Sequence, residues 1–175
     1  MSQKAHGTTA TAPHSNLRWG CSLKIADRIC CFNRRGAEPA GYFVSGTTFL
    51  SDLQHIVGND STTTAVLLEV EGEVAVAEEK EKEKEEQEEE ITFYDSVSMN
   101  PLFVAPKGRS MNSFIAESVA HGWPSFRDNE VVQDNVRVLP DGEVVSVSGT
   151  HLGHNIPDST GNRYCINLVS IAGCK

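Results

Sequence analysis

A short alternating run near the C-terminus constrains the fold more than any other stretch of the chain. It reads Tyr-Cys-Ile-Asn-Leu and begins at Tyr164. Because successive side chains of a β-strand point to opposite faces, a strand here would place Tyr164, Ile166 and Leu168 on one apolar face. Cys165 and Asn167 would share the other face. The pattern therefore predicts a strand with one face packed on a core and a thiol and an amide on the opposite face.

Similar short runs, separated by turn residues, occur along much of the chain. Pro-Asp-Gly at 140–142 predicts the turn of a β-hairpin, and Asn-Pro at 100–101 predicts another turn. Two stretches, 47–57 and 110–120, instead repeat apolar residues at helical spacing. We therefore expect a mainly β fold of antiparallel strands with a few short helices. The expected strands are 91–97, 102–105, 131–138, 143–148 and pieces of 22–42 broken by a turn at 33–36, with a loop over 149–162 before the last strand.

Most of the net charge of the chain comes from one segment. The 175 residues carry a formal charge of -9, and nine Glu with three Lys at 78–90 account for -6 of it. The rest of the chain has a net charge of -3 and no basic stripe that could neutralise phosphates, so nucleic acid is not an expected partner. We interpret 70–90 as a charged low-complexity insertion, either a solvated helix or a disordered loop.

The N-terminal composition and the cysteines bear on compartment. Residues 1–20 are small and polar, which fits a disordered tail and an organelle transit peptide equally well. No apolar run approaches the roughly 20 residues that a membrane-spanning helix needs. Five cysteines, an odd number, argue against a secreted disulfide scaffold. We therefore expect one monomeric domain over 21–175, in the cytoplasm or an organelle, neither secreted nor bound to a membrane.

The residues around Cys165 are those of a reactive thiol site. Arg163 lies two residues before Cys165, so a strand would turn both side chains to one face. A cation close to a thiol favours the thiolate, which is the nucleophilic form. His151 and His154 titrate near neutrality and can give a proton to a leaving oxygen. The simpler interpretation, an inert core thiol, suits a lone cysteine better than one with these neighbours.

Three boxes, taken in order, resemble the methionine-R-sulfoxide reductases, the MsrB family. They are Gly-Trp-Pro-Ser-Phe at 122–126, His-Leu-Gly-His at 151–154 and Arg-Tyr-Cys-x-Asn at 163–167. Gly-Ala-Glu-x-x-Gly-Tyr at 36–42 and Pro-Leu-Phe at 101–103 are similar to two earlier family elements. The resemblance covers about 28–173, interrupted by the insertion. It implies two small antiparallel sheets packed together, with the site on an open face.

The resemblance also implies an activity, reduction of the R epimer of methionine sulfoxide in peptides or proteins. Cys165 would attack the sulfoxide sulfur and become a sulfenic acid, which a further thiol resets. No bound cofactor is implied, because an external dithiol reductant such as thioredoxin would supply the electrons. The implied substrate residues are Trp123 with Phe126, as a dry wall for the S-methyl group, and Asp158, to orient a histidine or a site water.

The implied catalytic residues each have a physical task. Arg163 would favour the thiolate of Cys165. His154 or His151 would hydrogen-bond the sulfoxide oxygen and supply its proton. Asn167 would orient the site from the same strand face.

The chain departs from the family pattern at the zinc site and in the helix at 110–120, where relatives usually have a shorter link. Many family members bind a structural zinc through two Cys-x-x-Cys pairs. The matching positions here are Asp95, Ser98, Val145 and Ser148. Valine has no ligand atom and serine is a poor zinc ligand, so we expect no metal.

A second departure concerns the resolving cysteine, whose usual position is occupied by His121. Cys30 and Cys31 are adjacent, with Cα atoms about 3.8 Å apart, so they are not expected to bridge each other. One of them bridging Cys165 is the preferred hypothesis, with Cys21, Cys174 or a small thiol as alternatives. These departures also keep a second class of function open, a non-catalytic MsrB-like binding module that recruits a partner through its acidic insertion.

Overall fold

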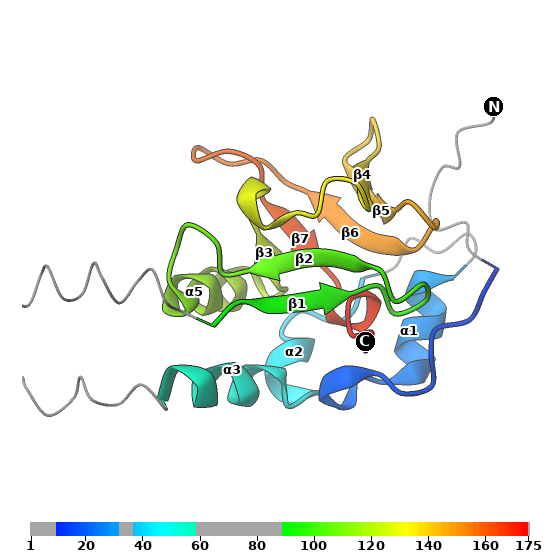
Figure 1. Cartoon of the computed structure of the whole chain (residues 1–175), viewed down its shortest axis with the longest axis horizontal. Coiled ribbons are helices and arrows are strands. Elements are labelled where there is room, and N and C mark those ends of the chain that lie inside the picture. Colours follow the sequence, from blue (N-terminus) through cyan, green and yellow to red (C-terminus); the bar gives the residue numbers. More distant parts are fainter. Residues whose placement is uncertain (1–9, 32–36, 59–88, 175) are drawn as a thin grey trace, which may run out of the picture.

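The computed structural model describes residues 10–31, 37–58 and 89–174 of the chain (Figure 1). The secondary structure of these residues consists of short elements. The helices are η1 (Arg18–Gly20), α1 (Leu23–Cys30), α2 (Tyr42–Ser45), α3 (Phe49–Gly58), α5 (Met111–His121), η2 (Asp128–Glu130) and η3 (Leu168–Ser170). The strands are β1 (Ile91–Tyr94), β2 (Pro101–Ala105), β3 (Ser125–Phe126), β4 (Val136–Val138), β5 (Glu143–Ser146), β6 (His151–Asn155) and β7 (Tyr164–Ile166).

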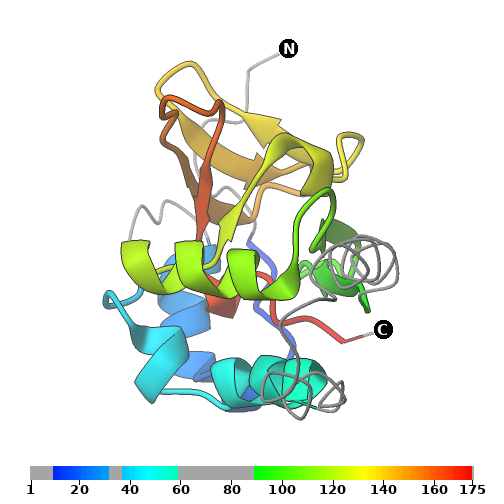
Figure 2. The same ribbon diagram turned by 90° about the vertical axis from the view of Figure 1, so that its left-hand side faces the viewer.

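These elements form two antiparallel sheets with helices on one side. In the part of the chain that the structure describes, β1 pairs with β2, and the second sheet has the order β3-β7-β6-β5-β4. Helices α1, α2 and α3 lie at the bottom of Figure 1, the β1–β2 pair crosses the middle, and the five-stranded sheet lies at the top. Figure 2 shows α5 between the lower helices and that sheet. The mainly β fold with two small antiparallel sheets is therefore confirmed.

The core between these layers is largely aromatic. Phe93 of β1 lies at its centre, with ring centroids 5.1 Å from Phe126, 5.9 Å from Phe49 and 6.2 Å from Phe114. Phe126 also stacks on Phe103 at 4.3 Å. Aromatic side chains bury large apolar areas, so this cluster joins the sheets and the helices into one core.

Both helices expected from apolar periodicity are present. The stretch predicted at 47–57 forms α3, and the one predicted at 110–120 forms α5. Ser110 caps α5 by accepting a hydrogen bond from the Ser113 amide, and Gly122 ends it in the left-handed conformation at φ 86°. Gly122 thereby turns the chain from α5 into β3.

Two expectations about local structure were wrong. The strand-like pieces expected within 22–42 are helical over Leu23–Cys30, because Ser22 caps this segment and its apolar residues Ala26, Ile29 and Cys30 are buried on one face. The loop expected over 149–162 contains β6, which lies between β5 and β7 in the sheet. The last strand also ends at Ile166, so Asn167 lies outside it, in the position directly before η3.

Described residues from the predicted N-terminal tail contact the rest of the domain. The His14 amide donates to the Ser96 carbonyl, and the Arg18 amide donates to the Ala172 carbonyl, both at 2.8 Å. Trp19 packs edge-on against Phe49. The turn expected at 33–36 and most of the charged insertion lie outside the described residues. Within the described ranges, no helix combines the length and apolarity needed to cross a bilayer.

Candidate active site

The candidate site is a row of four residues across the five-stranded sheet. In the strand register, Cys165 of β7 lies opposite Ser125 of β3 on one side and His154 of β6 on the other. His154 in turn lies opposite Glu143 of β5. Directly opposite residues share a face and have Cβ atoms about 5 Å apart. The neighbours of Cys165 on its own strand, Tyr164 and Ile166, point into the core, so the row lies on the other face of the sheet.

The thiol of Cys165 is in contact with a guanidinium. Arg163 Nη1 donates to Cys165 Sγ over 2.8 Å, as the two-residue spacing predicted. Cys165 is half-buried, whereas only 9% of the Arg163 side chain is exposed. A cation held in a largely desolvated position stabilises a negative charge on sulfur more than a mobile surface cation would. The arrangement therefore places a fixed cation in contact with a half-buried thiol.

The two histidines of the site differ in role. His154 is exposed beside Cys165, whereas His151 is buried, with its Nδ1 2.7 Å from Oε1 of Glu143. A carboxylate at this distance fixes which ring nitrogen carries the hydrogen. The geometry places His154 next to the thiol and makes His151, with Glu143, the buried layer behind it.

A β-bulge brings the two imidazoles together. On β5, Val144 pairs with Gly153 of β6, and the next residue, Val145, pairs with His151. Leu152 is skipped in this register and is the extra residue of the bulge. Without the bulge, a spacing of three would turn the two rings to opposite faces. Instead their centroids lie 5.9 Å apart.

Asn167 holds this bulge rather than facing the thiol. Its backbone amide and its side-chain Nδ2 both donate to the Leu152 carbonyl, at 2.8 and 3.0 Å. Its Oδ1 accepts a hydrogen bond from the Glu38 amide. Next to the bulge, a Cβ on Gly153 would lie 2.0 Å from the Cys165 carbonyl oxygen, so only glycine fits between β6 and β7 here.

Glu38 connects the tryptophan with the turn that follows the thiol strand. Its carbonyl accepts from Trp123 Nε1 at 3.0 Å, and its carboxylate accepts from the Leu168 and Val169 amides. Burial raises the pKa of Glu38 to about 7, and these two backbone hydrogen bonds oppose the rise. The half-buried Trp123 lies two residues before Ser125, and its indole is held by the Glu38 carbonyl.

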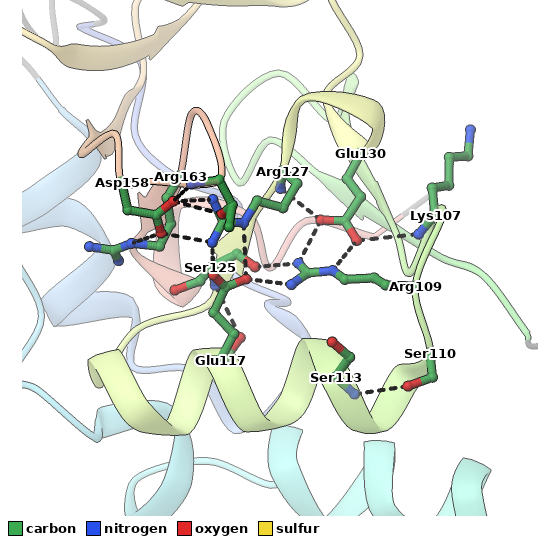
Figure 3. A network of polar contacts seen from close by, with 12 residues as sticks. Lys107, Arg109, Ser110, Ser113, Glu117, Ser125, Arg127, Glu130, Asp158 and Arg163 are labelled. Atoms are coloured by element: carbon green, nitrogen blue, oxygen red, sulfur yellow. Dashed lines mark hydrogen bonds and ion pairs between the residues drawn. The ribbon is translucent and has the colours of Figure 1, made fainter.

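Asp158 belongs to a network of charged side chains that ends at Arg163 (Figure 3). Its Oδ2 lies 3.9 Å from Arg163 Nε, and its carboxylate accepts two hydrogen bonds from Arg127. Hydrogen bonds from Arg127 and then Thr160 hold the pKa of Asp158 well below its usual value. Asp158 thus lies within charge-pair distance of the guanidinium without a hydrogen bond to Arg163 Nε, whereas the sequence suggested a histidine or a water as its partner.

Besides Asn167, three predicted site residues lie away from the thiol face. Phe126, expected in a substrate wall, is fully buried on the core face and stacked on Phe103. Cys30 is fully buried beneath η3, where its thiol contacts Ser170 Oγ, and burial raises its pKa. Cys31 is also buried, with its Sγ 3.5 Å from the Thr11 carbonyl oxygen.

The positions that match the zinc ligands hold a hydrogen-bonded cluster instead. Asp95 is fully buried, and its carboxylate accepts from the Val97 amide, Ser98 Oγ and Thr150 Oγ1, each at 2.9 Å. Val145 is buried and supplies no donor atom. These residues do not fit a zinc ion, and among the described residues no group of three or more His, Cys, Asp and Glu is arranged to bind a metal.

Four residues of this neighbourhood were not assigned from the sequence: Glu38, Glu117, Arg127 and Glu143. Glu143 had a signal, since it is an acid inside an alternating strand run. Glu38 lay inside the run at 36–42 without an assigned task. Nothing local to Glu117 or Arg127 indicates their contacts, because their partners are distant in sequence.

A guanidinium-bound thiol with an exposed imidazole beside it, on the face of a small β domain, defines a site for thiol chemistry. Comparison with known proteins agrees with this class. The chain is 43% identical over 65 residues to a peptide methionine sulfoxide reductase MsrB of Methanosarcina mazei, covering 31% of this chain and 46% of the relative. It is 44% identical over 61 residues to the MsrB of Methanosarcina barkeri, covering 29% and 42%. No family model matches the chain.

The chain is therefore related to the MsrB family. The matched region spans a little under half the length of these two curated relatives.

Proposed function

We propose that the chain is a peptide-methionine (R)-S-oxide reductase whose nucleophile is Cys165. The observation that carries the proposal is the 2.8 Å contact between Arg163 Nη1 and the half-exposed Cys165 Sγ, with His154 opposite on the next strand. Both matched relatives are named peptide methionine sulfoxide reductases, which supports the same substrate class. The preference for the R epimer is inferred from the resemblance to the family.

The first half-reaction uses groups of the row. The Cys165 thiolate attacks the sulfur of methionine sulfoxide, while His154, in its protonated form, gives a proton to the sulfoxide oxygen. The S–O bond breaks, the hydroxyl is transferred to Cys165 Sγ, and methionine leaves. Sulfur in the substrate is reduced by two electrons, and Cys165 is oxidised to a sulfenic acid. His151, which is held by Glu143, packs beside His154 and supports the position of the His154 ring.

Trp123 is the proposed wall for the S-methyl group of the substrate. Its indole nitrogen is already bonded to the Glu38 carbonyl, so the ring presents an apolar surface in one orientation. Phe126 has no part in this wall and acts through the core beneath β7.

The second half-reaction is proposed to use an external dithiol such as thioredoxin. Its first thiol attacks the Cys165 sulfenic acid and releases water, and its second thiol cleaves the resulting mixed disulfide, which returns Cys165 as a thiol. Cys21, Cys30 and Cys31 are buried, and burial raises the pKa of Cys21 to about 12. Buried thiols of this kind are poor attackers, so direct resolution by the reductant is favoured over an internal disulfide with any of these three.

Turnover of a methionine sulfoxide peptide with dithiothreitol tests the proposal. Separated R and S epimers are offered to the wild type, to Cys165→Ser and to Cys174→Ser, which removes a half-buried thiol elsewhere. The wild type and Cys174→Ser should reduce the R epimer at equal rates, and Cys165→Ser should fall to the background rate. Equal rates in the wild type and Cys165→Ser would contradict the proposed enzyme activity and favour the alternative, a non-catalytic binding module. Cys30→Ala and Cys31→Ala should retain turnover if the dithiol resolves Cys165 directly.

A further inference from the structure

We infer that Glu117 on α5 is a positioning residue for Cys165, because it holds two arginines that contact neighbours of the thiol: Arg127 bonds Asp158 beside Arg163, and Arg109 bonds Ser125, the cross-strand partner of Cys165. The inference deepens the proposed function and rests on it for its catalytic meaning. The contacts themselves are independent of any reaction. Figure 3 shows Glu117 projecting from α5 toward Arg127 and Arg109, with Asp158 and Arg163 beyond Arg127.

The first route runs through side chains. Glu117 Oε1 pairs with Arg127, and Arg127 Nη2 donates to Asp158 Oδ2 at 2.9 Å. Asp158 Oδ2 faces Arg163 Nε at 3.9 Å, and Arg163 Nη1 contacts the sulfur. The Arg127 guanidinium is planar and donates in a fixed fork, so it fixes where the Asp158 carboxylate lies. Asp158 acts on Arg163 through charge attraction at 3.9 Å, since Arg163 Nε has no hydrogen-bond partner among the described residues.

The second route runs through the backbone of β3. Glu117 Oε2 pairs with Arg109, and Arg109 Nη2 donates to the Ser125 carbonyl at 2.8 Å. The next residue of α5, Ser118, accepts from the Ser125 amide at 3.1 Å. Ser125 is the cross-strand neighbour of Cys165. Ser118 of α5, and Arg109 held by Glu117, therefore bind both backbone groups of the residue that flanks the thiol on β3.

Burial makes this arrangement rigid. The side chains of Glu117 and Arg109 are 15% and 14% exposed, and Arg109 is also held by the fully buried Glu130 at 2.8 Å. Burial raises the pKa of Glu117, but hydrogen bonds from Arg127 and Arg109 outweigh it and leave the pKa below its ordinary value. Removing one partner of such a partly desolvated network leaves a guanidinium without its acceptor, so the geometry of the remaining groups must change.

A substitution at Glu117 separates positioning from simple electrostatics, because the two act in opposite directions on the thiol. The charged and titratable groups around Cys165 are Arg163 on β7, His154 with Glu143 beyond it on β6 and β5, and Asp158 behind Arg163. Removing the negative charge of Glu117 would by Coulomb's law alone favour the thiolate. Releasing Arg127 and thereby Arg163 from the sulfur would disfavour it.

The test is the pH dependence of alkylation of Cys165 by iodoacetamide, followed on the peptide that contains it, in the wild type and Glu117→Gln. Glutamine keeps the length but has one carbonyl acceptor, so it cannot hold both arginines. In Glu117→Gln the midpoint pH of alkylation should rise by about one unit. At pH values below the midpoint this corresponds to a thiolate fraction about tenfold smaller than in the wild type. Asp134→Asn, which removes an exposed negative charge, should leave the midpoint unchanged.

Arg127→Lys provides a second readout if Glu117→Gln does not fold. Lysine keeps the charge but cannot bridge Glu117 and Asp158 with one planar group, so the midpoint should rise here as well. An unchanged or lowered midpoint in a folded Glu117→Gln, or an unchanged one in Arg127→Lys, overturns the inference. Alkylation measures the thiol without turnover, so loss of reductase activity alone would count against the proposed function and not against this positioning role.

Discussion

Replacing Thr150 by valine tests the cluster that occupies the place of the expected zinc site. Thr150 is fully buried, and its hydroxyl donates to both oxygens of the buried Asp95, at 2.9 and 3.0 Å. This contact ties the turn after β5 to the turn after β1. Valine keeps the shape of threonine and removes only the donor, so Thr150→Val measures what the hydrogen bond contributes to this cross-connection.

The expected loss follows from burial. A hydrogen bond to a charged group contributes about 1.5–3 kcal/mol, and a buried acceptor that loses a donor also loses the solvation it had in water. Asp95 keeps its bonds from the Val97 amide and Ser98 Oγ, which moderates the loss. We therefore expect Thr150→Val to lower the free energy of unfolding by about 2 kcal/mol. For a chain of this size the melting temperature should fall by about 6 °C.

Urea unfolding at neutral pH, with thermal unfolding in parallel, measures this change. The matched control is Thr160→Val, since the Thr160 hydroxyl also donates to an aspartate, Asp158, at 2.7 Å but is exposed. The control should lose less than about 0.5 kcal/mol, because water replaces the missing donor. Equal losses at the two positions would refute the argument from burial. A Thr150→Val protein as stable as the wild type would show that the Asp95 cluster does not hold the two turns together.

Two further predictions concern the groups beneath the site. Burial raises the pKa of Glu38 from 4.5 to about 7, so the folded state binds this proton more tightly than the unfolded state does. The resulting stability is fully present below about pH 4.5 and is lost as the pH rises through about 7. Between pH 4.5 and 8 the wild type should therefore lose about 3 kcal/mol more than Glu38→Gln in urea unfolding, and parallel pH profiles would contradict this. Phe126→Ala should lower the free energy of unfolding by about 3–5 kcal/mol through lost core packing, and a loss below 1 kcal/mol would mean that the ring is not in the core.

Strand alternation was enough to predict the central contact of the site. Because Arg163 and Cys165 are two residues apart on one strand, their common face follows from the period of the strand alone. The apolar periodicity of α3 and α5 likewise specifies those helices locally. Helix α1 was missed because its single buried stripe is short and interrupted by polar residues, and only its serine cap indicated it.

The remaining parts of the site depend on contacts that local patterns do not specify. The joint position of His151 and His154 requires an extra residue at Leu152, and no periodicity predicts a bulge. Asn167 was expected on the thiol face, but the strand ends before it and its amide holds the bulge. Phe126 was expected at the substrate because of its box, whereas its register opposite Tyr164 turns it into the core.

The central claim is that the Cys165 sulfur attacks a sulfoxide while Arg163 stabilises its charge, and one mass measurement tests it most directly. Protein free of reductant is exposed to a peptide carrying the R sulfoxide, trapped with a sulfenic-acid reagent and analysed intact and by peptide mapping. The account predicts one equivalent of methionine peptide formed per chain and the trapped adduct on Cys165. Methionine formation without any change at Cys165, or an unmodified protein and an intact sulfoxide, would contradict it.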